Sequence, residues 1–130
     1  MLALIDVDLF KAINDRLGHD AGDAVLRQVA LLMRAELREV DQLGRWGGEE
    51  FLLCAPDTSL AAAQPLAERL RRAVARHDFG QGVPVTVSIG LAPLLADDTP
   101  ERLLQRADRA LYRAKAQGRN RVEAQAVGLV

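Results

Sequence analysis

Carboxylate side chains in two parts of the chain have the type and spacing expected of a metal site. Glu49 and Glu50 follow a glycine pair in segment 47–51, Gly-Gly-Glu-Glu-Phe. Paired glycines allow a tight hairpin turn and leave room for a ligand against bare backbone. Asp6 ends an apolar run, where a buried carboxylate needs a cation beside it. Because Mg²⁺ prefers hard oxygen ligands and binds nucleotide phosphates, this pattern indicates a Mg²⁺-nucleotide site.

A second carboxylate, Asp8, follows Asp6 at the spacing that puts both on one face of an extended chain. A calcium-binding EF-hand loop counted from Asp6 is excluded, because its fifth and sixth positions hold Phe10 and Lys11 instead of an Asp or Asn followed by Gly. For Asp8 taken alone, we favour a role as the N-terminal cap of a short helix that contains Phe10.

Three cationic side chains stand where they could meet phosphate groups. Lys11 lies one turn into the helix expected after the acidic strand, and Lys115 and Arg119 bracket Gly118 at the end of the last long helix. A triphosphate requires such cations. The alternative for Lys115 and Arg119 is that they only complement the helix dipole, and without further context that alternative is favoured.

Asn14 and Asp23 together have the groups needed to recognise guanine. An amide can donate to the guanine carbonyl, and a carboxylate can accept from its N1–H and amino groups. Each residue considered separately is better explained as a turn or cap residue.

The segment 38–41, Arg-Glu-Val-Asp, precedes the glycine pair and offers a second binding pattern. An arginine fork with a nearby carboxylate can hold the edge of a purine and its phosphate. The alternative is an ordinary charged helix end, which spacing alone does not exclude.

Composition limits the class of protein. At 130 residues the chain is long enough for one domain with its own core. A net charge of −1 argues against a general nucleic-acid-binding surface, so no DNA partner is expected. Cys54 is the only cysteine, which fits a reducing cytoplasm, and no apolar run approaches the ~20 residues that span a bilayer. A cytoplasmic domain is expected, and membrane anchoring of the parent protein stays open.

The hydrophobic pattern predicts an α/β (α+β) sandwich in which helices pack on a mostly antiparallel sheet. The glycine pair is expected to join the two strands of a hairpin, and Pro65 to kink its helix or delay its start. The polar stretch 18–23 is expected to be a loop or the start of the next helix. Strands are expected at 2–7, 42–46, 50–55, 85–91 and 121–124, and helices near 9–14, at 24–37, after a turn and cap in 56–59, and from a cap at Thr99 to Gly118.

Several motifs, in this order, resemble the GGDEF family of diguanylate cyclases in its accepted Glu variant. They cover nearly the whole chain. The stretches that carry the resemblance are Asp-Val-Asp-Leu-Phe-Lys-Ala-Ile-Asn-Asp at 6–15, Gly-His-Asp-Ala-Gly-Asp at 18–23, Arg-Trp-Gly-Gly-Glu-Glu-Phe at 45–51, Val-Ser-Ile-Gly at 87–90, Ala-Asp-Arg-Ala-Leu-Tyr at 107–112 and Ala-Lys-Ala-Gln-Gly-Arg-Asn at 114–120.

The resemblance implies a nucleotidyl-cyclase-like palm fold and the condensation of two GTP into cyclic di-GMP and two pyrophosphates. It implies a face-to-face homodimer and a divalent cofactor, Mg²⁺ or Mn²⁺. The metal ligands it implies are Asp6, the Val7 carbonyl, Glu49 and Glu50. The catalytic residues are Glu49, Glu50 and Lys11, and the substrate contacts are Phe10, Asn14, Asp23, Gly47, Gly48, Lys115 and Arg119.

The resemblance further implies an inhibitory site for the product cyclic di-GMP, formed by Arg38, Asp41 and Arg69. The catalytic domain is expected at 1–125 with a tail at 126–130. Members of the family usually have a helix and a further segment before the first strand, which we expect this piece to lack. We therefore expect an upstream sensory domain in an active parent protein, and weak or no activity from this piece alone. The competing hypothesis is a catalytically silent domain that binds cyclic di-GMP or GTP and regulates a partner.

Overall fold

Five strands and four helices follow one another along residues 1–125, the part of the chain that the computed structural model describes. The tail predicted at 126–130 lies outside these described residues. None of the helices found in 1–125 is long and apolar enough to cross a membrane. In chain order the elements are β1 (Leu2–Val7), α1 (Phe10–Leu17), α2 (His19–Arg34), β2 (Gln42–Arg45), β3 (Glu50–Cys54), α3 (Leu60–Ala75), β4 (Val87–Ala92), α4 (Pro100–Ala116) and β5 (Val122–Ala124).

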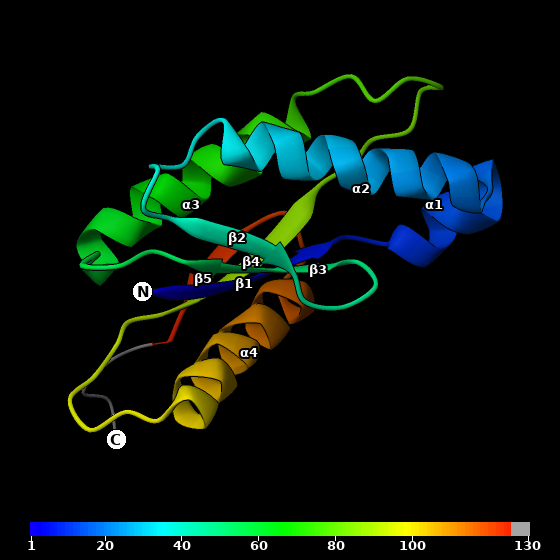
Figure 1. Ribbon diagram of the computed structural model, residues 1–130. Coiled ribbons are helices and arrows are strands. Elements are labelled where there is room, and N and C mark those ends of the chain that lie inside the picture. Colours follow the sequence, from blue (N-terminus) through cyan, green and yellow to red (C-terminus); the bar gives the residue numbers. More distant parts are fainter. Residues whose placement is uncertain (126–130) are drawn as a thin grey trace.

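The strands form one sheet in the order β2-β3-β1-β4-β5, with β1 in the middle. β1 pairs antiparallel with β3 and β4, β2 pairs antiparallel with β3, and β5 runs parallel to β4. Figure 1 shows α2 and α3 over one face of the sheet and α4 on the opposite face. The predicted sandwich with a mostly antiparallel sheet is confirmed.

Alternate side chains of β1 pack into two different cores. The odd-numbered residues of segment 3–7 lie in the larger core, which α2 and α3 cover. Leu2 and Leu4 pack instead against α4. Asp6 continues this second row, because side chains of a strand repeat their direction every two residues. The carboxylate of Asp6 therefore faces α4.

α4 packs directly on the backbone of β4 at Gly90. A Cβ at this position would lie 2.3 Å from the amide N of Leu111 and 2.4 Å from the carbonyl O of Ala107. Both are backbone atoms, so no side-chain rotation could make room. Glycine at position 90 allows α4 to lie close enough to the sheet for its last turn to reach the end of β1.

The helix α2 differs from its predicted range at both ends. It begins at His19 instead of near Ala24, so most of the polar stretch 18–23 is its first turn, and it ends at Arg34 instead of Leu37. Gly18, with φ of 92°, separates α1 from α2. A polar first turn suits a helix start, because free N–H groups and the dipole favour polar and acidic side chains there.

The cap predicted within 56–59 and the cap predicted at Thr99 are confirmed. Ser59 and Thr99 accept hydrogen bonds from the backbone N–H groups of Ala62 and Arg102, each at 3.2 Å. The helix α3 nevertheless begins at Leu60 and passes through Pro65, so the late helix start expected there is wrong. Pro65 has no N–H to donate to the Ala61 carbonyl and its ring crowds that carbonyl, so the kink that was the other expectation stays a prediction.

Candidate active site

Sheet pairing brings the predicted carboxylates together at one end of β1. Asp6 is the direct partner of Glu50 in the β1–β3 register, and the Val7 N–H donates to the Glu49 carbonyl at 3.1 Å. Directly opposite side chains of antiparallel strands lie on the same face. Asp6 and Glu50 therefore share the α4 face of the sheet, and Glu49 lies in the turn directly before β3.

Asp6 is 4% exposed and forms an ion pair with Lys115, whose Nζ donates to its Oδ2. Burial raises the pKa of the Asp6 carboxyl and Asp8 adds to the rise, while the positive charges of Lys115 and Arg119 oppose it. Burial and the neighbouring Asp6 also raise the pKa of Glu50. Both carboxylates are therefore held ionised only at a cost, which additional positive charge would lower.

This group of oxygens fits a Mg²⁺ ion that is completed by a substrate. Among residues 1–125, no three His, Cys, Asp or Glu side chains are arranged as a metal site made by the protein alone. Mg²⁺ is usually held by one or two carboxylates together with waters and substrate phosphates. Asp6, the Val7 carbonyl, Glu49 and Glu50 offer that kind of partial site.

The turn between β2 and β3 confirms the predicted hairpin and corrects one of the two reasons expected for its glycines, the need of a tight turn. The Trp46 N–H donates to the Glu50 carbonyl at 2.8 Å, and the Arg45 guanidinium donates to the Gly48 carbonyl at 2.6 Å. Neither Gly47 nor Gly48 has a positive φ, so the turn itself does not demand glycine. A Cβ on Gly48 would have no atom of residues 1–125 within 4 Å. The glycines keep an open surface beside the carboxylates.

The predicted guanine-reading residues lie on the pair of helices α1 and α2. The Oδ1 atom of Asn14 is buried and has no hydrogen-bond partner within residues 1–125. It lies against Gly22, where a Cβ would come within 1.7 Å of it and within 3.1 Å of Phe10 Cζ. Asp23 follows Gly22 on the exposed side of α2. Because Gly22 has no side chain, the Asn14 amide can lie directly against the backbone of α2.

Phe10 and Lys11, both predicted to serve the substrate, have different surroundings. Phe10 is 8% exposed and belongs to the larger core, while Lys11 is exposed on α1. Lys115 and Arg119 lie at and just after the end of α4, close enough to Asp6 that both charges lower its pKa. The structure therefore brings Lys115 and Arg119 to the carboxylates, and leaves Lys11 exposed to solvent.

Asp8 does not cap α1, contrary to expectation. The N-cap residue is Leu9, in left-handed conformation with φ of 53°, and no side chain caps the helix. Asp8 is 7% exposed and accepts hydrogen bonds from Thr86 Oγ1 at 2.7 Å, Ser88 Oγ at 2.6 Å and Asn120 N at 3.0 Å. Sequence reasoning missed this role because all three donors lie at least 78 positions further along the chain, although the spacing after Asp6 marked the residue.

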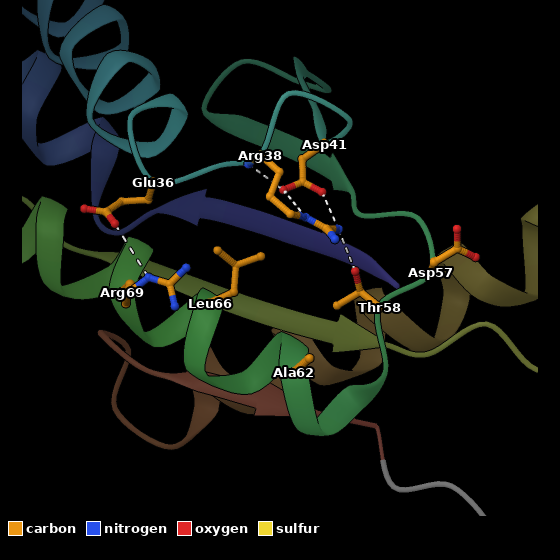
Figure 2. Close-up of a pocket in the computed structure, with 8 residues that line it drawn as sticks. All are labelled: Glu36, Arg38, Asp41, Asp57, Thr58, Ala62, Leu66 and Arg69. Carbon is orange, nitrogen blue, oxygen red and sulfur yellow. Dashed lines mark hydrogen bonds and ion pairs between the residues drawn. The ribbon is translucent and has the colours of Figure 1, made fainter.

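A second site surrounds Arg38. Its guanidinium donates to Asp41 Oδ1 and to Thr58 Oγ1, both at 2.8 Å, and its hydrogen bond to Asp41 lowers the pKa of that carboxyl. Arg69 lies across from this pair on α3, 3.6 Å from a carboxylate oxygen of Glu36 (Figure 2). The three predicted residues line one cleft of about 210 Å³, together with Glu36, Asp57, Thr58, Ala62 and Leu66.

The family model described as diguanylate cyclase, GGDEF domain, matches residues 1–121. The chain belongs to the GGDEF domain family. The resemblance found in the motifs is thus confirmed over nearly the whole length of this GGDEF domain.

Individual relatives agree with the assignment. The response regulator PleD of Caulobacter vibrioides is 49% identical over 125 residues, which are 92% of this chain and 28% of PleD. The active GGEEF domain of a diguanylate cyclase from Vibrio cholerae superposes with a TM-score of 0.91 at 36% identity, over 96% of this chain and 81% of that one. The GGDEF domain of DgcB from Caulobacter crescentus, in complex with c-di-GMP, gives a TM-score of 0.87 at 34% identity, over 95% and 76% of the two chains. The chain thus spans about 28% of the length of its curated relative PleD.

Proposed function

We propose that this GGDEF domain is the catalytic part of a diguanylate cyclase, which joins two GTP into cyclic di-GMP and releases two pyrophosphates. The observation that carries the proposal is the pairing of Asp6 with Glu50 across two strands, with Glu49 beside them and Lys115 contacting Asp6. A receptor without catalysis would have no need of this complete set of carboxylates. A relative from Pseudomonas aeruginosa that is 46% identical over 126 residues is named diguanylate cyclase DgcP.

The carboxylates would hold a divalent ion, Mg²⁺ or Mn²⁺, together with the phosphates of GTP. The residues in reach of such an ion are Asp6, Glu49 and Glu50, with the Val7 carbonyl as a further oxygen. When bound, the ion would offset negative charge at the α-phosphate and favour ionisation of the attacking hydroxyl. The raised pKa values of Asp6 and Glu50 support this, because both carboxylates lie where added positive charge is favourable.

Glu49 is proposed to accept the proton of the attacking 3′-hydroxyl, assisted by Glu50. The 3′-oxygen forms a bond to the α-phosphorus, the bond from that phosphorus to the bridging oxygen breaks, and pyrophosphate leaves. Lys11 would stabilise the charge that develops on the transferred group, and Lys115 and Arg119 would hold the leaving phosphates. Positioning of the two reacting groups supplies much of the remaining rate enhancement.

Asn14 and Asp23 are proposed to read the guanine base, with Phe10 behind it and Gly47 and Gly48 leaving room for the nucleotide. The surroundings of Asn14 support this assignment, because its side chain lies against Gly22 and next to Phe10 and its Oδ1 has no hydrogen-bond partner within residues 1–125. The amide N–H₂ is then free to donate to the guanine carbonyl.

A face-to-face homodimer completes the reaction in this proposal. The product is two-fold symmetric and needs two new bonds, and each domain has one set of carboxylates.

We further propose that cyclic di-GMP binds the cleft of Arg38, Asp41 and Arg69 and restrains the enzyme. In the parent protein an upstream sensory domain would control how two such domains meet.

The decisive experiment incubates the domain, and a longer piece of the parent protein, with GTP and Mg²⁺ and measures cyclic di-GMP and pyrophosphate. Formation of both products in a ratio of one to two is expected from at least the longer form. If neither form gives product while both still bind cyclic di-GMP, the domain is a silent receptor and the cyclase proposal is wrong.

A further inference from the structure

Asp8 is a buried carboxylate that the proposed reaction does not use. Its two oxygens accept three hydrogen bonds, two from hydroxyls on and next to β4 and one from the backbone N–H of Asn120. Asn120 lies in the turn that follows α4, 112 positions further along the chain. The residue therefore ties the end of β1 to this turn.

The turn held by Asp8 has an unfavourable backbone conformation. Gly118, Arg119 and Asn120 have φ of 123°, 63° and 48°, so two successive residues with a Cβ lie in the left-handed region. Such residues adopt this conformation only where surrounding contacts enforce it. Besides Asp8, two contacts hold this turn: the Arg119 N–H donates to the Ala114 carbonyl of α4 at 2.9 Å, and Arg71 Nη1 of α3 donates to Asn120 Oδ1 at 2.8 Å.

Arg119 stands between the helix end and the anchored residue. Lys115, one turn earlier, is held by Asp6, and Asn120 is held by Asp8. Two carboxylates at the end of β1 thus fix both sides of the segment that carries Arg119. The Arg119 N–H is bonded to α4, and Asp8 holds the residue that follows Arg119, so the direction in which the Arg119 side chain leaves the backbone depends on both contacts.

We propose that Asp8 is a positioning residue that directs Arg119 toward the phosphates of the bound nucleotide. The inference rests on the proposed function, in which Arg119 contacts the triphosphate. If Asp8 served only the fold, its loss would weaken the binding of every ligand equally. If it acts through Arg119, its loss should weaken the binding of a nucleoside triphosphate and leave the binding of a nucleoside monophosphate nearly unchanged.

The test compares two probes, GMP and guanosine 5′-(α,β-methylene)triphosphate, whose carbon bridge prevents pyrophosphate release. Affinities are measured by calorimetry with Mg²⁺ present. Asp8→Asn keeps the size of the side chain and replaces one acceptor oxygen with a donor. We expect this variant to bind the triphosphate analogue about tenfold more weakly, as for the loss of one charge-assisted contact, and to change the affinity for GMP by less than about twofold. Thr86→Val removes another donor to Asp8 without touching the turn, so it should leave the ratio of the two affinities unchanged.

Two further variants decide whether the effect passes through Arg119. In an Arg119→Ala background, Asp8→Asn should cause no additional loss of affinity for the analogue, because the effects of substituting two coupled residues do not add. Arg71→Ala removes the hydrogen bond from α3 to Asn120 without changing Asp8. It should cause the same selective loss of affinity for the triphosphate analogue, even if the Asp8→Asn variant does not fold.

The outcomes separate the two proposals. If the unaltered domain binds the analogue no more tightly than GMP, the proposed phosphate site is wrong. If it prefers the analogue but Asp8→Asn weakens both probes equally, or adds its full effect to Arg119→Ala, then Asp8 is only structural and the inference is overturned.

Discussion

The Nζ of Lys115, in the last turn of α4, donates to Oδ2 of Asp6 at the end of β1. The contact joins the two elements that enclose the candidate active site. It also places a cation beside a buried carboxylate, where the proposed metal ion would act. Lys115 thus balances the charge of Asp6 in the protein without a ligand.

Lys115→Ala is expected to lower the free energy of unfolding by about 1–3 kcal/mol at neutral pH, because it leaves a buried carboxylate without its partner. The Asp6 pKa is already raised by burial and would rise further. A carboxyl with a raised pKa destabilises the fold where it is ionised. The loss should therefore shrink as the pH falls through that pKa, since a protonated Asp6 needs no cation.

Urea denaturation at a series of pH values measures this effect. Arg109→Ala, an exposed position of the same helix, serves as the control and should change stability little at any pH. A loss that is equal at about pH 4 and about pH 7 would contradict the assigned role of the ion pair.

Glu49→Gln should reduce the formation of cyclic di-GMP by about 10²–10⁴-fold, because it removes the proposed proton acceptor and a metal ligand while keeping the size of the side chain. The matched control is Glu39→Gln, an exposed carboxylate outside the site, which should retain full activity. Both variants should melt at the temperature of the unaltered domain. Equal activity of the two variants would exclude Glu49 from catalysis.

Gly22→Ala should push the Asn14 amide away from α2, since the new Cβ would lie 1.7 Å from its Oδ1. We expect a destabilisation of about 1–3 kcal/mol and a weaker preference for GTP over 2-aminopurine riboside triphosphate, which lacks the carbonyl that Asn14 would bind. Gly44→Ala is the control, because a Cβ there meets no atom of residues 1–125 within 4 Å. An unchanged ratio of the affinities for these two nucleotides would show that Gly22 serves packing alone.

Arg38→Ala should abolish most of the binding of cyclic di-GMP at the second cleft, because Arg38 supplies the fork that Asp41 and Thr58 hold in place. Loss of one bidentate arginine contact corresponds to at least about tenfold in affinity. Arg72→Ala on the outer face of α3 is the matched control. Titration with cyclic di-GMP should therefore distinguish the two variants, and undiminished binding by Arg38→Ala would rule out the cleft as the product site.

Stability should fall between about pH 4 and about pH 2 through the ion pair of Asp98 and Arg106. Arg106 donates to both carboxylate oxygens of Asp98, at 2.7 and 2.6 Å, and this contact lowers the pKa of Asp98 to about 2. A carboxyl with a lowered pKa stabilises the fold above its unfolded pKa, and this contribution is lost as the pH falls through the folded value. Asp98→Asn should lose stability at about pH 7 and show a shallower decline below about pH 4 in acid titration monitored by circular dichroism.

Local structure and the chemistry of the side chains could be predicted from the sequence alone. The apolar run at 2–7 predicted a strand, and segment 56–59 and Thr99 predicted two helix starts that are confirmed. These features depend on neighbours a few residues away, so they can be read from the chain directly. The motifs likewise marked Asp6 and Glu49 as candidates and indicated the family, because they consist of residue types at fixed spacings along the chain.

Contacts between groups that lie far apart along the chain depend instead on the fold. Strand register set Asp6 opposite Glu50, and the close approach of α4 at Gly90 allowed Lys115 to reach Asp6. Asp8, expected to cap a helix, instead accepts hydrogen bonds from donors far along the chain, the most distant being the backbone N–H of Asn120. Such contacts depend on how strands pair and layers pack, because a polar group that becomes buried takes its partner from whatever element is brought beside it.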